Sequence, residues 1–329
     1  MSRIRSLDAL KAVAVLGVIC LHAIQPKESL AWQVVVEICR FAVPCFFLAT
    51  GFFFMAAWRR EPDQPALIWR YANRLLKPFL FWGIFYAVIP PFVGGAPAGI
   101  KAAVLEHLLN IVKYPHSFLL TWGNVYHLWF LSSLLQAAAI VWICLRLWNL
   151  RAALLIGALF YGLALMGGPY SEVFFGFHLN ANKGPLVSTL FFAIGAWLAD
   201  RRPTFPPFLA GVLLGSGLWL HLAEASFLHG AYGRPLTSNA YLLGTIPYAV
   251  GVMLLALSFP RLGLGVARLG TYSLGIYAFH VYIIEILLGL PIGRTLANSP
   301  LLFCCVVFGI TLGVVVPLSK IAWARPFIL

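Results

Sequence analysis

Charged residues are scarce in this chain. Only 10 of its 329 residues are Asp or Glu, and all charged residues together make up 10% of the sequence. Soluble domains carry about 25% charged and about 45–50% apolar residues, whereas this chain is 61% hydrophobic. The composition therefore excludes an ordinary soluble enzyme. The apolar stretches are continuous and do not alternate with polar residues, which favours membrane-spanning helices over a β-barrel.

Two kinds of binding pattern are also missing. The sequence has no CxxC pair and no metal-ligand spacing, so we expect no metal site and interpret the six cysteines as small core residues. The net charge of +13 comes from small basic groups between apolar runs. Such groups indicate topology signals and lipid contacts, not a nucleic-acid surface. The cysteines are Cys20, Cys39, Cys45, Cys144, Cys304 and Cys305.

Ten apolar stretches are long enough, at about 17–25 residues, to cross a bilayer as helices. We predict an all-α polytopic membrane protein with one domain over residues 1–329 and no soluble domain. The connections 96–124 and 169–183 contain Pro, Gly and polar residues, which indicates loops with short interfacial helices. The first span has a long apolar core and no clear cleavage site, so we expect a permanent helix and not a signal peptide. The spans cover residues 7–24, 34–57, 78–95, 125–146, 152–168, 184–199, 207–223, 239–258, 271–288 and 300–323.

The distribution of Lys and Arg predicts the orientation. With a cytoplasmic N-terminus, 16 of the 23 basic residues fall in inside segments and six in outside segments, and Arg40 lies within the second span. Cytoplasmic loops carry an excess of Lys and Arg. Ten spans with this bias predict that both termini are cytoplasmic.

Ionisable residues within the first span are the most informative. A charge at the centre of a membrane helix costs about 2.5–3.5 kcal/mol on insertion scales, so such residues often mark functional cavities. Asp8 and Lys11 lie at the start of the first span, and His22 follows 11 residues after Lys11. This spacing is close to three helical turns, which puts Lys11 and His22 on one stripe about 16 Å apart. An interfacial Asp8–Lys11 ion pair and an interfacial His22 remain an alternative.

Other spans place ionisable residues at a similar depth. Glu37 and Arg40 have i,i+3 spacing in the second span, and we predict that they join His22 in one cavity in the outer half of the membrane. A structural ion pair between them is the alternative. A histidine beside a carboxylate is suited to proton transfer near neutral pH. The other residues predicted to face this cavity are His127, His280 and Glu285.

A basic cluster is predicted on the cytoplasmic side. Arg70, Arg74 and Lys77 are spaced four and three residues apart, so they share one face of a helix that leads into Pro78. Together with Lys11 they would suit a phosphate-bearing ligand. Contact with anionic lipid is the alternative.

These residues resemble the motifs of the integral-membrane acyltransferase-3 family. The series Asp8, Lys11 and His22 is similar to that family's first motif, although Arg is more usual than Lys at the second position. The segment RFAVPCFFLATGFFF at 40–54 is similar to the family's FFxxSGFF segment, with Thr50-Gly51 in place of Ser-Gly. Three further segments match in order, namely RLLKP at 74–78, HLWFL at 127–131 and SLGIYAFH at 273–280.

The resemblance implies an O-acyltransferase of the bacterial cytoplasmic membrane. The implied donor is cytoplasmic acyl-CoA, with acetyl-CoA the first candidate, and the implied acceptor is a hydroxyl of an extracytoplasmic glycan or a lipid-linked sugar. Lys11, Arg70, Arg74 and Lys77 would then bind the phosphates of the donor. The sequence leaves open the acceptor, the acyl group and whether the chain is a monomer or a homo-oligomer.

The resemblance also suggests catalytic roles. His22 would act as general base or transient acyl carrier, Glu37 would orient it, and Arg40 or His280 would stabilise the developing oxyanion. We expect His127, Trp129, Tyr277 and Glu285 to contact the acceptor, and the rings of Trp122, Tyr126 and Trp129 to be available for stacking on a sugar. A transporter that uses the same His and carboxylate residues as a proton relay is the alternative from another class.

Overall fold

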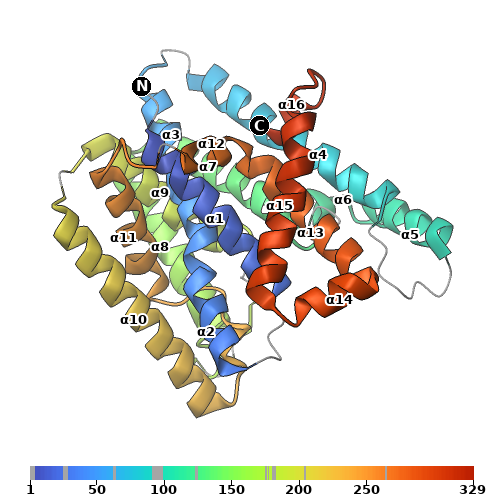
Figure 1. Cartoon of the computed structure of the whole chain (residues 1–329). Coiled ribbons are helices and arrows are strands. Elements are labelled where there is room, and N and C mark those ends of the chain that lie inside the picture. Colours follow the sequence, from blue (N-terminus) through green and yellow to red (C-terminus); the bar gives the residue numbers. More distant parts are fainter. Residues whose placement is uncertain are drawn as a thin grey trace.

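The computed structural model describes residues 4–24, 29–61, 64–90, 99–122, 125–174, 176, 178–179, 183–203, 205–263 and 265–329. Within these residues the chain forms α-helices joined by short 3₁₀ and π turns, and no strand, as the composition predicts (Figure 1). The elements are α1 (Arg5–Ala23), α2 (Leu30–Ile38), η1 (Cys39–Phe41), α3 (Ala42–Trp58), α4 (Gln64–Val88), α5 (Gly99–Lys113), α6 (Pro115–Ser117), η2 (Phe118–Trp122), α7 (Trp129–Leu147), α8 (Leu150–Gly167), α9 (Pro185–Arg201), α10 (Pro207–Tyr232), η3 (Leu236–Ser238), α11 (Thr245–Ser258), α12 (Val266–Leu269), η4 (Gly270–Tyr272), α13 (Ser273–Gly289), α14 (Pro291–Ala297), α15 (Pro300–Leu318) and α16 (Arg325–Ile328).

Seven helical stretches in the described part of the chain are long and apolar enough to cross a membrane. They are α1, the continuous run from α2 to α3, α7, α8, α10, the run from α12 to α13, and α15. Each of the ten predicted spans overlaps a helix, but α9 and α11 have only 17 and 14 residues. The chain is therefore a multi-pass membrane protein, while ten crossings and their orientation stay predictions.

Several predicted boundaries are wrong. The third span was expected to begin at residue 78, but α4 begins at Gln64 and continues through Pro78. The first half of α4 carries Arg70, Arg74 and Lys77 and is helical, as their spacing predicts, although it lies outside the apolar stretch. α10 likewise extends to Tyr232, beyond the expected end at residue 223.

The centre of the bundle depends on a close crossing of α3 and α9. Gly51 of α3 and Gly195 of α9 each face the backbone of the other helix. A Cβ atom at Gly51 would overlap the carbonyl oxygen of Phe192, and one at Gly195 would overlap that of Leu48. Small residues allow helix backbones to approach closely in membranes. The Thr50-Gly51 segment thus has a packing role, because its glycine permits the crossing.

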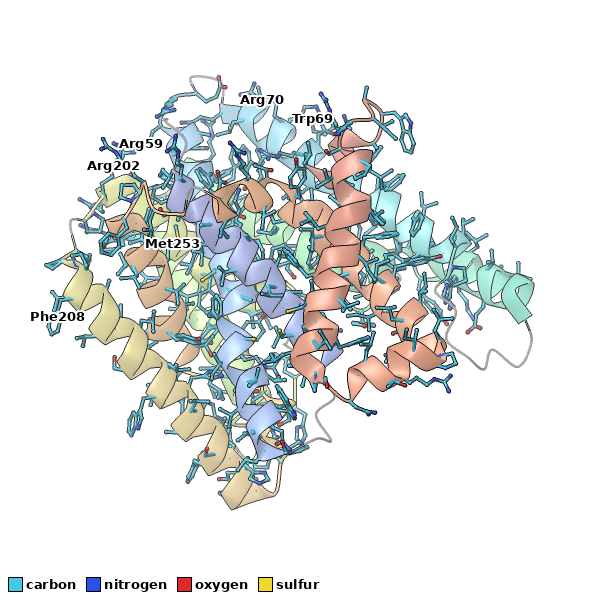
Figure 2. The ribbon with its side chains drawn as sticks, viewed as in Figure 1. Arg59, Trp69, Arg70, Arg202, Phe208 and Met253 are labelled. Atoms are coloured by element: carbon cyan, nitrogen blue, oxygen red, sulfur yellow. The ribbon has the colours of Figure 1, made fainter. Side chains whose placement is uncertain are left out.

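Both chain ends lie at the same end of the bundle (Figure 1). Arg59, Arg70 and Arg202 project from that end, whereas Phe208 projects sideways from α10 (Figure 2). Phe208 is among the exposed large apolar side chains of α10, as expected for a lipid-facing surface.

Of the six cysteines, four are buried, Cys39 is half-buried and Cys305 is exposed, so the core prediction is wrong for Cys305.

Candidate functional site

Three histidines from distant parts of the sequence lie together inside the bundle. His22 is near the end of α1, His127 is in the turn before α7, and His280 is on α13. The ring centroids of His22 and His280 are 5.3 Å apart, and those of His127 and His280 are 5.4 Å apart. His127 and His280 are buried, whereas His22 is half-buried. We call these three residues the histidine cluster.

Backbone contacts fix the tautomers of the two buried histidines. Nδ1 of His280 lies 2.6 Å from the carbonyl oxygen of Tyr277, and Nε2 of His127 lies 3.2 Å from that of Ala278. A carbonyl only accepts, so each of these ring nitrogens is the N–H donor. The other nitrogens, Nε2 of His280 and Nδ1 of His127, are buried and have no hydrogen-bond partner among the described residues. The cluster therefore contains two buried lone pairs that can each accept a hydrogen bond.

Two tyrosines hold this part of the site in place. The hydroxyl of Tyr277 donates to the backbone carbonyl of His127, and that of Tyr86 donates to the carbonyl of Ala278 at 2.9 Å. Both phenol rings also contact the imidazole of His127. The ring of His127 is thus held by α4 and α13, and the positions of His127 and His280 are coupled.

A cavity of about 430 Å³ lies between Lys11 and Tyr277, and Tyr277 separates it from the histidine cluster. Lys11 and Arg74 lie on its wall together with Thr50 and Tyr71, and Tyr277 is also part of the wall. The ring of Tyr277 is 6.0 Å from that of His280. We call this space the Lys11 cavity, and it connects two basic side chains with the vicinity of the histidines.

The predicted basic residues do not all face this cavity. Lys11 forms an ion pair with Asp8 at 2.6 Å, as the alternative interpretation predicted, and also lines the cavity. Arg74 lines it too. Arg70 pairs instead with Glu61 at the exposed surface, and the exposed Lys77 is not part of the cavity wall.

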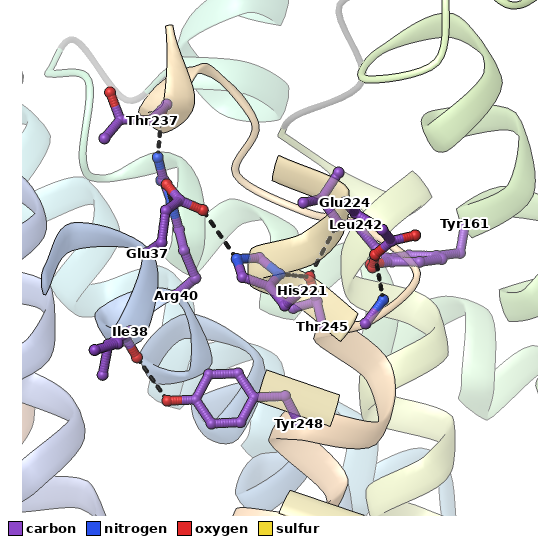
Figure 3. A network of polar contacts seen from close by, with 11 residues as sticks. Glu37, Ile38, Arg40, Tyr161, His221, Glu224, Thr237, Leu242, Thr245 and Tyr248 are labelled. Carbon is purple, nitrogen blue, oxygen red and sulfur yellow. Dashed lines mark hydrogen bonds and ion pairs between the residues drawn. The ribbon is translucent and has the colours of Figure 1, made fainter. Parts of the chain in front are cut away.

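Glu37 and Arg40 belong to a different polar network (Figure 3). The fully buried carboxylate of Glu37 accepts from Arg40 Nε at 3.2 Å and contacts Nε2 of His221 at 2.9 Å. Arg40 also donates to the carbonyl oxygen of Thr237 at 2.5 Å. The predicted pairing of Glu37 with His22 is not what the structure contains. A buried carboxylate needs a partner, and α10 supplies it in His221.

His221 was missed by the sequence analysis. It is fully buried on α10, and its Nδ1 lies 3.0 Å from Oγ1 of Thr245 on α11. Thr245 Oγ1 in turn accepts from the backbone N–H of Leu242 at 2.8 Å. A histidine within an apolar span was the same signal that identified His22 and His280, and it could have identified His221.

The remaining predicted residues lie around the cluster. Trp129 is half-buried with its ring 6.3 Å from that of Phe47, and Glu285 is half-buried on α13. The ring of Tyr126 lies 5.3 Å from that of His22. The side chain of Trp122 lies outside the described part of the structure.

Two cations, Arg40 and Lys183, lie near His22. Lys183 lies just before α9, within electrostatic reach of His22. Burial lowers the pKa of Lys183 to about 8, because a charged ammonium is less favourable away from water.

Among the described residues, no three His, Cys, Asp or Glu side chains are placed to hold one metal ion.

Comparison with known proteins gives one family match. A family model described as "Acyltransferase domain" matches residues 4–320, which is nearly the whole chain. A protein of Enterococcus faecalis named "Amino-acid racemase" is 26% identical over 173 residues. That match covers 48% of this chain and only 22% of the relative, so the chain spans about a fifth of its length. No solved structure matches the chain.

Proposed function

The chain belongs to the acyltransferase-3 family and is a membrane acyltransferase; from this premise we propose its donor, acceptor and site. The proposed donor is cytoplasmic acyl-CoA, with acetyl-CoA the first candidate. The proposed acceptor is a hydroxyl of an extracytoplasmic glycan or lipid-linked sugar, and the proposed location is the bacterial cytoplasmic membrane. Residues 1–329 would act as one domain, as a monomer or a homo-oligomer.

The Lys11 cavity is the observation that carries this proposal. Lys11 and Arg74 offer cationic groups to the phosphates of a nucleotide, and Tyr277 lies on the same cavity wall beside the histidine cluster. A coenzyme A molecule bound this way would direct its thioester toward the histidines. The family's usual Arg is Lys11 here, which supplies charge without a planar bidentate contact.

In the proposed reaction His22 is the general base. It takes the proton of the acceptor hydroxyl while that oxygen attacks the thioester carbonyl. The new C–O bond forms, the C–S bond breaks, and the proton passes to the departing thiolate of CoA. Transient acylation of His22 itself is the other route compatible with the same residues.

The tautomers of the neighbouring histidines refine their proposed roles. His280 presents an acceptor nitrogen to the cluster, so it would accept the N–H of His22 and orient that ring. The lone pair of His280 cannot stabilise an oxyanion. Of the two residues predicted for that role, His280 and Arg40, only Arg40 can therefore supply a positive charge. The guanidinium of Arg40 lies within electrostatic reach of His22, although it is hydrogen-bonded to Glu37 and Thr237.

Replacement of His22 tests this function directly. We expect His22→Ala to lower acyl transfer about 100- to 10,000-fold, which is the usual effect of losing a general base. Thermal stabilisation of the purified protein by CoA should be retained, because the ligand still binds the native state. His229→Ala is the matched control, since His229 is exposed near the end of α10. Near-normal turnover of the His22 variant, at equal protein levels in membranes, would contradict the mechanism.

A further inference from the structure

A second cavity is linked to the histidine cluster through Tyr126, which lines it and contacts His22 and His127. It has a volume of about 410 Å³ and is formed by α5, α6, η2 and the turn before α7. Asn110, Tyr114, Ser117 and Tyr126 supply its polar groups, and Phe118 is among its apolar residues. We call this space the Tyr114 cavity. Its volume is in the range of small-molecule sites.

The two cavities approach the same histidines through different tyrosines. Tyr126 lines the Tyr114 cavity, and its ring lies 5.3 Å from that of His22 and 5.9 Å from that of His127. Tyr277 lines the Lys11 cavity, and its ring lies 5.6 Å from that of His127. No described residue belongs to both linings. This is the arrangement that a transfer between two substrates requires, with one space for each.

The lining of the Tyr114 cavity favours a neutral, hydroxyl-rich ligand. Among the described residues, no charged side chain lines it, and Tyr114 and Tyr126 are 44% and 41% exposed. Exposed aromatic faces stack on the apolar face of a sugar ring. The amide of Asn110 and the hydroxyl of Ser117 can each donate to and accept from sugar hydroxyls. Lys113 has its Nζ 5.3 Å from the centroid of the Tyr114 ring and is not part of the lining.

We propose that the Tyr114 cavity is the acceptor subsite and that it takes a neutral sugar ring. A ring that stacks on Tyr126 would present a hydroxyl to His22, the residue that Tyr126 contacts. This assignment rests on the proposed function, and it adds the place and the charge of the acceptor. It needs no further reactant, because the hydroxyl proton leaves through His22 to the thiolate of CoA.

Blocking the cavity tests its position. In a Cys305→Ser background, Asn110→Cys is treated with a bulky fluorescein maleimide, and Glu106→Cys, one turn earlier on α5 and outside the lining, serves as the control. The assay follows radiolabel from acetyl-CoA into the acceptors of the source membranes. Modification at residue 110 should abolish transfer and leave stabilisation by CoA unchanged, whereas modification at residue 106 should change neither.

The outcomes separate this inference from the proposed function. Normal transfer after modification at residue 110 would overturn the acceptor subsite while leaving the acyltransferase mechanism standing. Absence of transfer and of CoA stabilisation in the unmodified protein would overturn the proposed function, and the subsite with it. Loss of CoA stabilisation only after modification at residue 110 would assign the cavity to the donor.

Substitutions in the lining test the ligand class. Tyr114→Ala should raise the KM for the acceptor about two- to tenfold with kcat little changed, because a stacking contact contributes about 0.5–1.5 kcal/mol. Tyr114→Phe keeps the ring and should raise the KM less than Tyr114→Ala. Asn110→Asp loses the amide donor and should raise the KM for a neutral sugar by an amount that does not depend on salt. A large loss in Asn110→Asp that is relieved by high salt would show an anionic acceptor and overturn the assignment of a neutral ring.

Discussion

At the scale of single residues, the structure separates basic side chains that the sequence grouped together. Arg70 and Arg74 are one helical turn apart on α4, yet only Arg74 lines the Lys11 cavity, while Arg70 pairs with Glu61. We expect Arg74→Ala to weaken binding of CoA by about 1–3 kcal/mol, the range for a hydrogen bond to a charged group. Arg70→Ala should leave affinity unchanged. Titration of purified variants with CoA measures both, and equal losses would favour a diffuse surface effect.

Glu37 and His221 give a second prediction at this scale. Both side chains are fully buried and contact each other, so Glu37→Ala should lower the free energy of unfolding by about 3–5 kcal/mol, as expected when one partner of a buried pair is removed. The double variant with His221→Ala should lose less than the sum of the single losses. Thermal and denaturant unfolding in detergent would measure this.

The ion pair of the exposed Glu172 with the half-buried Arg234 provides the control for that double-mutant cycle. Surface ion pairs contribute little to stability, so Glu172→Ala should unfold nearly as the unmodified chain does. Additive losses for Glu37 and His221 would show that their contact is not energetically coupled.

The buried ionisable residues could be identified from the sequence, but the side chains that they contact could not. Histidines and carboxylates in apolar spans are visible in the sequence because burying them is costly. Their pairing depends on the rotation of helices far apart in the chain, and Glu37 and His221 are separated by 184 positions. Nothing in the local pattern around Glu37 distinguishes His221 from His22 as its neighbour.

At the scale of helices, Gly51 and Gly195 should be sensitive to the smallest possible substitution. A methyl group at either position would overlap the backbone of the facing helix, so Gly51→Ala and Gly195→Ala should each separate α3 from α9 and strongly reduce the folded yield. The control is Gly215→Ala on α10, where an added Cβ has nothing within 4 Å. It should be neutral or slightly stabilising, because Ala has the better helix propensity.

Size-exclusion profiles and thermal unfolding of the three glycine variants would measure this effect. A normal Gly51→Ala protein would show that α3 and α9 can move apart at little cost.

The location of most helices could be predicted, because continuous apolar stretches are a direct signal. Helix ends were harder to predict. The charged first half of α4 lies outside the apolar stretch that begins at residue 78, although its basic residues were expected on a helix, and α11 begins at Thr245, inside the span predicted from residue 239.

At the scale of the whole molecule, the remaining prediction is the orientation in the membrane. Cysteines at residues 60 and 265 should react with an impermeant maleimide from the cytoplasmic side, and cysteines at residues 110 and 230 from the outside. The bias of 16 basic residues to six motivates this assignment. If cysteines at residues 60 and 110 reacted from the same side, this result would contradict the predicted number of crossings. It would also contradict the outer position of the Tyr114 cavity.

The aromatic and histidine rings that link the two cavities also bear on the ion permeability of the membrane. His22, Tyr126, His127, Tyr277 and His280 form a continuous set of ring contacts between the Lys11 and Tyr114 cavities. A substrate channel open to both faces would let ions run down the transmembrane potential, which stores about 2.3 kcal/mol per charge at 100 mV. Acyl transfer from a donor in one cavity to an acceptor in the other needs no such open channel. With the acceptor outside the membrane, as proposed, the cell would modify it while keeping that membrane insulating.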